Sequence, residues 1–210
     1  MENQLNNENI AIRNSLRDKI VTFGEIIKPG FNFGTVTKEE NPNEYFTAAV
    51  LNKIYSLNIS TENILFANDV SLSQYLYRYI YELYTKVFYI FSGASDEKIV
   101  LRLRKFFNNN DLKITEYQAG IKDDFIPPKF KESHKKKYKM MSRFAHPNIE
   151  SLNMHLGKTP DQQFGLLAPT IDLILWHSVA IVKLFTDLKL LNLDKNIDQK
   201  KLISLQGGSA

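Results

Sequence analysis

Two charged side chains stand one helical turn apart in an otherwise apolar segment. Arg78 and Glu82, followed by Lys86, are spaced i, i+4 and i+8, so on a helix their charged groups lie along one face. Burying such charges is costly unless they pair or meet a polar site. The spacing therefore leaves two interpretations, a surface ladder of salt bridges or a polar pocket inside a helical bundle.

A second group of chemically active side chains lies further along the chain. Tyr138, Ser142 and His146 are also spaced i, i+4 and i+8, and Pro147 ends their helix. Imidazole is the natural proton carrier near neutral pH, and a helix C-terminus favours its cationic form. A metal-independent ribonuclease needs a base for the 2′-hydroxyl and a cation for the phosphate, which His146 and Arg143 together could supply. The alternative is a histidine that caps its helix by hydrogen bonding.

Basic residues surround this second group. They are Lys129, Lys131, Lys135, Lys136, Lys137, Lys139 and Arg143, with Phe130 and Tyr138 between them. Such a patch is an electrostatic footprint for a polyanion such as RNA, and its alternative is a solvated helix face. The residues expected to bind an RNA substrate are Tyr138, Arg143, Lys135, Lys136 and Lys137.

The composition narrows the class of protein. Of 210 residues, 43% are hydrophobic and 12% aromatic, which is too apolar for a disordered chain. Only 9 Gly and 7 Pro are present, which argues against a turn-dense all-β fold. Cys is absent, which excludes disulfides, thiolate zinc sites and a cysteine nucleophile. No zinc-helix motif, Gly-rich phosphate loop or G-x-S-x-G motif occurs, so neither a metal nor a cofactor is expected.

Helical periodicity dominates the chain and predicts an all-α fold. The helices are expected at about 8–28, 43–57, 71–92, 95–108, 130–146 and 162–191, with Asn43 capping the second and Pro169 bending the last. They predict an irregular up-and-down bundle in one domain spanning 1–206, with N-terminal helices at 8–57 and a core bundle at 71–191. Residues 207–210 resemble an appended linker and are left outside the fold.

The helix at 71–92 is expected to be the most buried, because apolar and aromatic side chains cover most of its circumference. Its predicted core stripe is Leu72, Leu76, Tyr79, Leu83, Val87 and Ile90.

A membrane-like stretch at 164–185 contains Pro169, Asp172 and His177, which favours a central helix of a soluble bundle. His177 is expected to be a core histidine. The N-terminus lacks a secretory pattern, so a cytoplasmic protein without membrane contact is expected.

Two motifs in the order Arg78-x-x-x-Glu82 and Tyr138-x-x-x-Ser142-x-x-x-His146-Pro147 resemble those of a bacterial family of helical proteins, the DUF5677-type domain. The resemblance covers roughly residues 45–190. It extends to the wider HEPN-type bundles of bacterial defence and toxin–antitoxin systems, in which such residues usually meet across a dimer. It implies a HEPN-like bundle, RNA as a partner and a homodimer. Arg143 and His146 are closer in sequence than the Arg and His of the HEPN motif, so the phosphate-binding cation is assigned to Arg78.

Three functional hypotheses follow. In the first, an RNA-directed protein, His146 is the acid or base, Arg78 binds phosphate, Glu82 orients one of them and Ser142 shares their catalytic site. In the second, a non-catalytic interaction module, the same four side chains form a buried hydrogen-bond network that fixes helix register. In the third, the many tyrosines line a pocket for a small ligand.

Overall fold

The computed structural model describes residues 5–28, 37–91, 93–108, 132, 136, 139, 157–191 and 199–205. Within these residues the regular secondary structure is helical, without a strand, which confirms the all-α prediction. The helices are α1 (Asn7–Ile27), α2 (Pro42–Ala67), α3 (Val70–Phe91), α4 (Asp96–Asn108), α8 (Pro160–Asp187) and α9 (Gln199–Ser204). The short helix α9 is not among the predicted elements.

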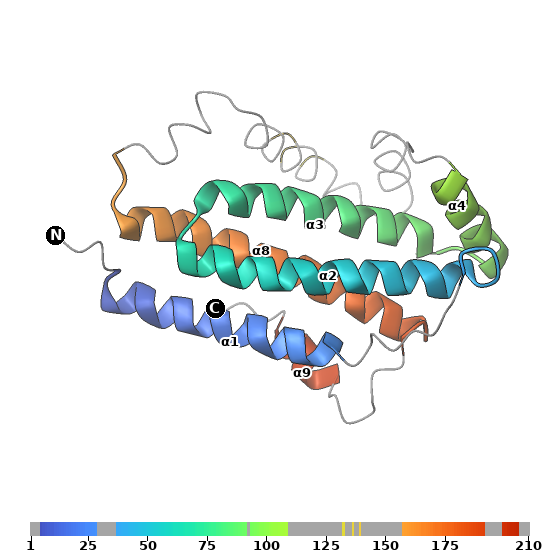
Figure 1. Cartoon of the computed structure of the whole chain (residues 1–210), viewed down its shortest axis with the longest axis horizontal. Helices are drawn as coiled ribbons and strands as arrows, with labels where there is room; N and C mark the ends of the chain where they lie inside the picture. Colours follow the sequence, from blue (N-terminus) through green and yellow to red (C-terminus); the bar gives the residue numbers. More distant parts are fainter. Residues whose placement is uncertain are drawn as a thin grey trace.

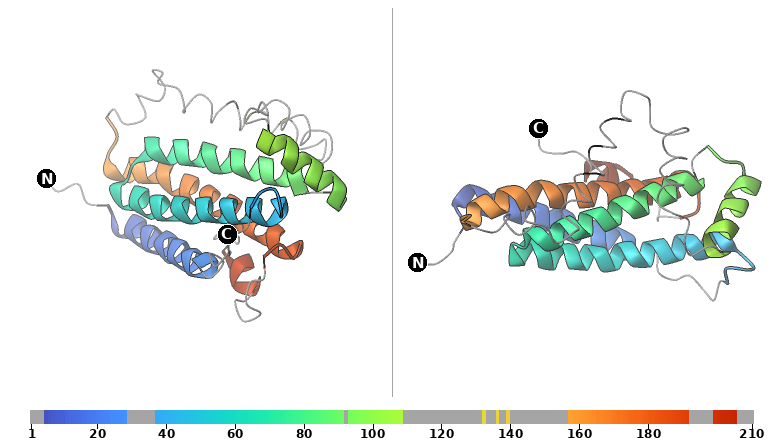
Figure 2. Two further views of the ribbon diagram at one scale, coloured as in Figure 1. Left: turned by 45° about the vertical axis from the view of Figure 1, so that its right-hand side comes forward. Right: turned by 90° about the horizontal axis from the view of Figure 1, so that it is seen from above.

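The long helices α1, α2, α3 and α8 lie side by side along the long axis of the molecule (Figure 1). Helix α4 lies across one end, against α2 and α3, and α9 contacts α8. Helices α3 and α8 run in the same direction, because Gln74 meets Thr170 near their starts and Phe91 meets Phe185 near their ends. Helix α2 runs opposite to them (Figure 2), so the bundle is irregular, as predicted.

Helix α8 forms much of the core. Within the described residues it is the one helix long and apolar enough to cross a membrane, and 61% of its most apolar window is buried in the bundle. It packs against α1 and α2 and most extensively against α3. Phe164, Ile171 and Phe185 are fully buried. These contacts agree with the expected role as a central helix, and α8 continues through Pro169.

Some helix ends differ from the predicted ones. Helix α2 is capped by Asn41, not by Asn43, because the Asn41 side chain accepts a hydrogen bond from the backbone N–H of Glu44. Its apolar spacing continues past Leu57 to Ala67, and it ends where Asn68 takes the left-handed conformation. Helix α8 ends at Asp187, earlier than predicted, and Lys189 just beyond has a positive φ of 57°.

The predicted core stripe of α3 is partly wrong. Leu76, Val87 and Ile90 are buried, but Leu72 and Tyr79 are 51% and 45% exposed. Helix α3 instead buries a face that also carries Ser73, Tyr77, Ile80 and Tyr81. The physical reason is that tyrosines extend the apolar surface of α3 beyond one stripe, so the helical period leaves the edges of the buried face open and the position of α8 selects them. About as large a share of α8 as of α3 is buried, so α3 is not distinctly the most buried helix.

Helices α1 and α2 approach closely at Gly24. Asn58 is buried beside it, and its Nδ2 donates a hydrogen bond of 2.9 Å to the carbonyl of Ile20. A Cβ atom at Gly24 would lie 2.9 Å from that Nδ2 atom. The glycine therefore leaves room for a polar contact between two helices in an otherwise apolar core.

We expect Gly24→Ala to lower the free energy of unfolding by about 1–2 kcal/mol, because the methyl group displaces the buried Asn58 amide. The loss exceeds the gain of up to about 1 kcal/mol that alanine brings to a helix interior. The control is Gly165→Ala in α8, where a Cβ would meet nothing within 4 Å, and which should raise stability by about 0.5–1 kcal/mol. Urea denaturation measures both variants, and equal stabilisation would contradict the close contact.

Candidate functional site

Arg78 and Glu82 form an ion pair on α3. The Nε atom of Arg78 lies 2.9 Å from Oε1 of Glu82, and the two side chains are 23% and 21% exposed. The pair is therefore neither a fully solvated surface contact nor sealed in the core. The predicted i, i+4 pairing is confirmed, and the partial burial favours a polar site over a simple surface ladder.

The polar stripe of α3 begins one turn earlier, at Gln74. Its Nε2 donates a hydrogen bond of 3.0 Å to Oγ1 of Thr170 on α8, and that hydroxyl donates to the carbonyl of Leu166 at 3.1 Å. Gln74, Arg78 and Glu82 therefore follow one helix face, and its first member is tied to the neighbouring helix. This link helps to fix where Arg78 and Glu82 stand relative to α8.

Most of the second group of predicted site residues lies outside the described residues. That group comprises Tyr138, Ser142, Arg143, His146, Lys135 and Lys137. Lys136 is described, and it is helical and exposed, as are Glu132 and Lys139. The approach of Arg78 to His146 therefore stays a prediction, and so does the expected helix at 130–146 beyond these three positions.

A buried histidine lies beside this stripe, at the contact between α3 and α8. His177 is 5% exposed, and its ring centroid lies 4.9 Å from Tyr84 and from Trp176, 5.4 Å from Tyr81 and 5.6 Å from Tyr77. Its Nδ1 atom lies 2.7 Å from the carbonyl of Leu173, an arrangement in which Nδ1–H donates. The prediction of a core histidine is confirmed. Its aromatic surroundings were not predicted, because the α3 tyrosines are distant in sequence.

Two tyrosines of this cluster have raised pKa values. Burial raises the pKa of Tyr77 to about 12 and also raises the pKa of Tyr84, because a phenolate is disfavoured away from water. The hydroxyl oxygen of Tyr77 is buried and has no hydrogen-bond partner among the described residues. A neutral phenol without a partner is poorly suited to be a base, so this cluster supports packing more than proton transfer.

The acidic and histidine side chains do not gather into a metal-binding arrangement in the part of the chain that the structure describes. There, no group of three or more His, Asp or Glu residues is close enough to hold an ion. The chemistry available at α3 is therefore that of the Arg78 guanidinium and the Glu82 carboxylate, which can orient each other and bind an anion or a donor.

We expect Tyr77→Phe to raise the free energy of unfolding by about 1 kcal/mol, because it removes a buried hydroxyl that has no partner. The free energy of unfolding of the variant should also fall less than that of the wild type as the pH becomes alkaline. The pKa of Tyr77 is higher in the folded state than in the unfolded chain, so the unfolded chain loses its proton first. Stability then falls as pH rises from 10 towards 12, by about 1–2 kcal/mol for this residue.

Chemical denaturation at several pH values, with tyrosine ionisation followed by absorbance, measures both effects. The matched control is Tyr75→Phe, since Tyr75 is 45% exposed on the same helix. An alkaline loss that is equal in the two variants would contradict the assignment to Tyr77.

Comparison with known proteins gave no relative. No protein-family model matches the sequence, and neither a curated protein nor a solved structure matches it. The likeness to DUF5677-type and HEPN-type proteins therefore rests on the two motifs.

Proposed function

We propose that this chain is an RNA-directed helical protein of the HEPN-like kind, a metal-independent ribonuclease or RNA-binding component of a bacterial defence or toxin–antitoxin locus. The observation that carries the proposal is the Arg78–Glu82 pair, 2.9 Å apart and only partly exposed on a core helix. The carboxylate holds the guanidinium in one orientation, while the remaining exposure lets a phosphate approach it. Such a fixed cation suits recognition of a nucleic-acid backbone.

In this proposal the second motif supplies the chemistry. His146 acts as acid or base, Ser142 shares its site, and Arg78 binds the phosphate. The substrate-binding residues are Tyr138, Arg143, Lys135, Lys136 and Lys137. The exposure of Lys136 and Lys139 supports this role, since a phosphate-binding patch must face solvent. The proposal includes a homodimer in the cytoplasm.

A second candidate function is a non-catalytic interaction module. It is favoured by the bond between Gln74 and Thr170, which shows that the α3 polar stripe already serves to connect helices. In that case the pairing of Arg78 with Glu82 neutralises the charge and fixes helix register, and an RNA phosphate is not its partner.

One variant separates the two candidates. If the site is catalytic, His146→Ala should reduce cleavage of single-stranded RNA by about 10²–10⁴-fold, with an almost unchanged melting temperature. The assay contains EDTA, because the proposed reaction needs no metal. If the site is structural, the same variant leaves buried polar groups without hydrogen-bond partners. Each such group lowers the free energy of unfolding by about 1–3 kcal/mol, so the melting temperature falls by several degrees.

The control for this experiment is His134→Ala, a histidine of the same region without an assigned role. It should retain both cleavage and stability. Wild-type protein that neither cleaves nor binds RNA, together with a strongly destabilised His146→Ala variant, would reject the RNA-directed function in favour of the interaction module.

The variant Arg78→Gln tests independently whether Arg78 contacts an RNA phosphate. A phosphate contact at Arg78 predicts weaker RNA binding and a salt dependence with a slope smaller by about one. RNA titrations at several salt concentrations measure this slope. An unchanged slope would show that Arg78 does not contact phosphate.

A further inference from the structure

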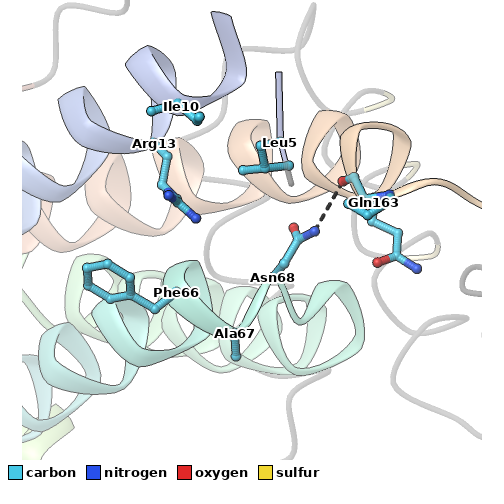
Figure 3. A pocket seen from close by; sticks show the side chains of 8 residues that line it. Leu5, Ile10, Arg13, Phe66, Ala67, Asn68 and Gln163 are labelled. Carbon is cyan, nitrogen blue, oxygen red and sulfur yellow. Dashed lines mark hydrogen bonds between the residues drawn. The ribbon is translucent and has the colours of Figure 1, made fainter. Parts of the chain in front are cut away.

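A cavity of about 590 Å³ lies where the N-terminal part of α1, the end of α2 and the start of α8 meet (Figure 3). Its volume falls within the range of about 300–1,000 Å³ that is common for small-molecule sites. The lining residues are Leu5, Ile10, Arg13, Phe66, Ala67, Asn68, Pro160 and Gln163. It is therefore formed by segments that are far apart in the sequence and is distinct from the α3 site.

Arg13 brings a positive charge to the cavity. Within the described part of the chain its guanidinium forms no ion pair, and its Nε atom is buried without a hydrogen-bond partner. Two nearby carboxylates are engaged elsewhere: Glu62 pairs with Arg17, and Asp161 accepts hydrogen bonds from Asn6 and Asn9. A buried N–H donor without a partner is unfavourable, so an anion entering the cavity would gain a strong interaction.

Asn68 provides the complementary group. Its Nδ2 donates a hydrogen bond of 3.1 Å to the carbonyl of Pro160, which fixes the orientation of the amide. Its Oδ1 atom is buried and has no hydrogen-bond partner in the part of the chain that the structure describes. Figure 3 shows that the Arg13 guanidinium and this oxygen face the same space between α1 and α2. The cavity thus offers one cationic donor and one neutral acceptor.

The cavity also has apolar wall segments beside its polar groups, and its walls are preformed. Leu5, Ile10 and Phe66 provide apolar surface. The wall between α1 and α8 is fixed by Asp161, which accepts from the Asn6 backbone at 2.9 Å and from Asn9 Nδ2 at 2.7 Å. These bonds hold the pKa of Asp161 below its usual range, so the carboxylate stays charged. Its negative charge beside a single guanidinium disfavours a dianion.

We propose that this cavity binds a small amphipathic monocarboxylate that also carries a hydroxyl donor. The carboxylate pairs with Arg13, the hydroxyl donates to Oδ1 of Asn68, and the hydrocarbon part covers the apolar walls. Each unsatisfied group of the cavity thereby gains the partner that its chemistry requires.

Isothermal titration calorimetry tests this site with 2-hydroxyhexanoate as the probe. We expect saturable binding of one molecule per chain. Hexanoate, which lacks the donor for Asn68, should bind about 2–10-fold more weakly, and uncharged 2-hydroxyhexanamide about 10–100-fold more weakly. Sulfate, which is a dianion at neutral pH, should not compete, because one guanidinium does not balance two negative charges.

The matched variants are Arg13→Gln and Arg17→Gln, which remove guanidinium groups one turn apart on α1. Arg13→Gln should weaken the binding of 2-hydroxyhexanoate by about 10–100-fold while leaving the melting temperature nearly unchanged. Arg17→Gln should weaken binding far less than Arg13→Gln, since Arg17 pairs with Glu62 and reaches the cavity only through its stacking on the outer side of the Phe66 ring. The absence of saturable binding, equal affinity for acid and amide, or equal losses in the two variants would each overturn the proposal. The acid–amide comparison uses the wild-type chain and so does not depend on the folding of a variant.

Discussion

The bundle depends on covering α8, a long apolar helix that contains several polar side chains. Those side chains are accommodated because each bonds to a carbonyl of its own helix. The bonds run from Thr170 to Leu166, from His177 to Leu173, from Ser178 to Ile174 and from Thr186 to Val182. Hydroxyl and imidazole groups that are satisfied within their own helix can be buried in an apolar core. This allows α1, α2 and α3 to pack on α8 mainly through apolar contacts.

Helix α3 has three faces with different surroundings. One face packs on α8 and surrounds His177 with aromatic rings, and a second carries Gln74, Arg78 and Glu82 at partial exposure. A third face leaves Leu72 and Tyr79 open to solvent. A charged pair on a helix whose opposite side is locked in a core has little freedom to move, which is the requirement for a preorganised anion site. The same rigidity suits a structural network that fixes helix register.

Helix α8 borders both proposed sites. Its first turn lines the cavity with Pro160 and Gln163, and further along Thr170 contacts the polar stripe of α3. The two sites nevertheless differ in character. The α3 site has a cation already matched by a carboxylate on its own helix, whereas Arg13 faces a cavity without such a match. Ligand binding proposed for the cavity is therefore separable from the RNA chemistry proposed for α3.

The sequence by itself determined the helical class, the approximate positions of most described helices and the pairing of Arg78 with Glu82. These properties depend on neighbours within about one helical turn, which periodicity and spacing express directly. Only the tertiary structure decided how far the buried face of α3 extends around the helix, since its tyrosines suit both an apolar contact and a partly exposed position. It also decided that the start of α1 and the end of α2 would place Arg13 and Asn68 around one cavity. No local pattern links these two residues, because their proximity results from the packing of three helix ends against one another.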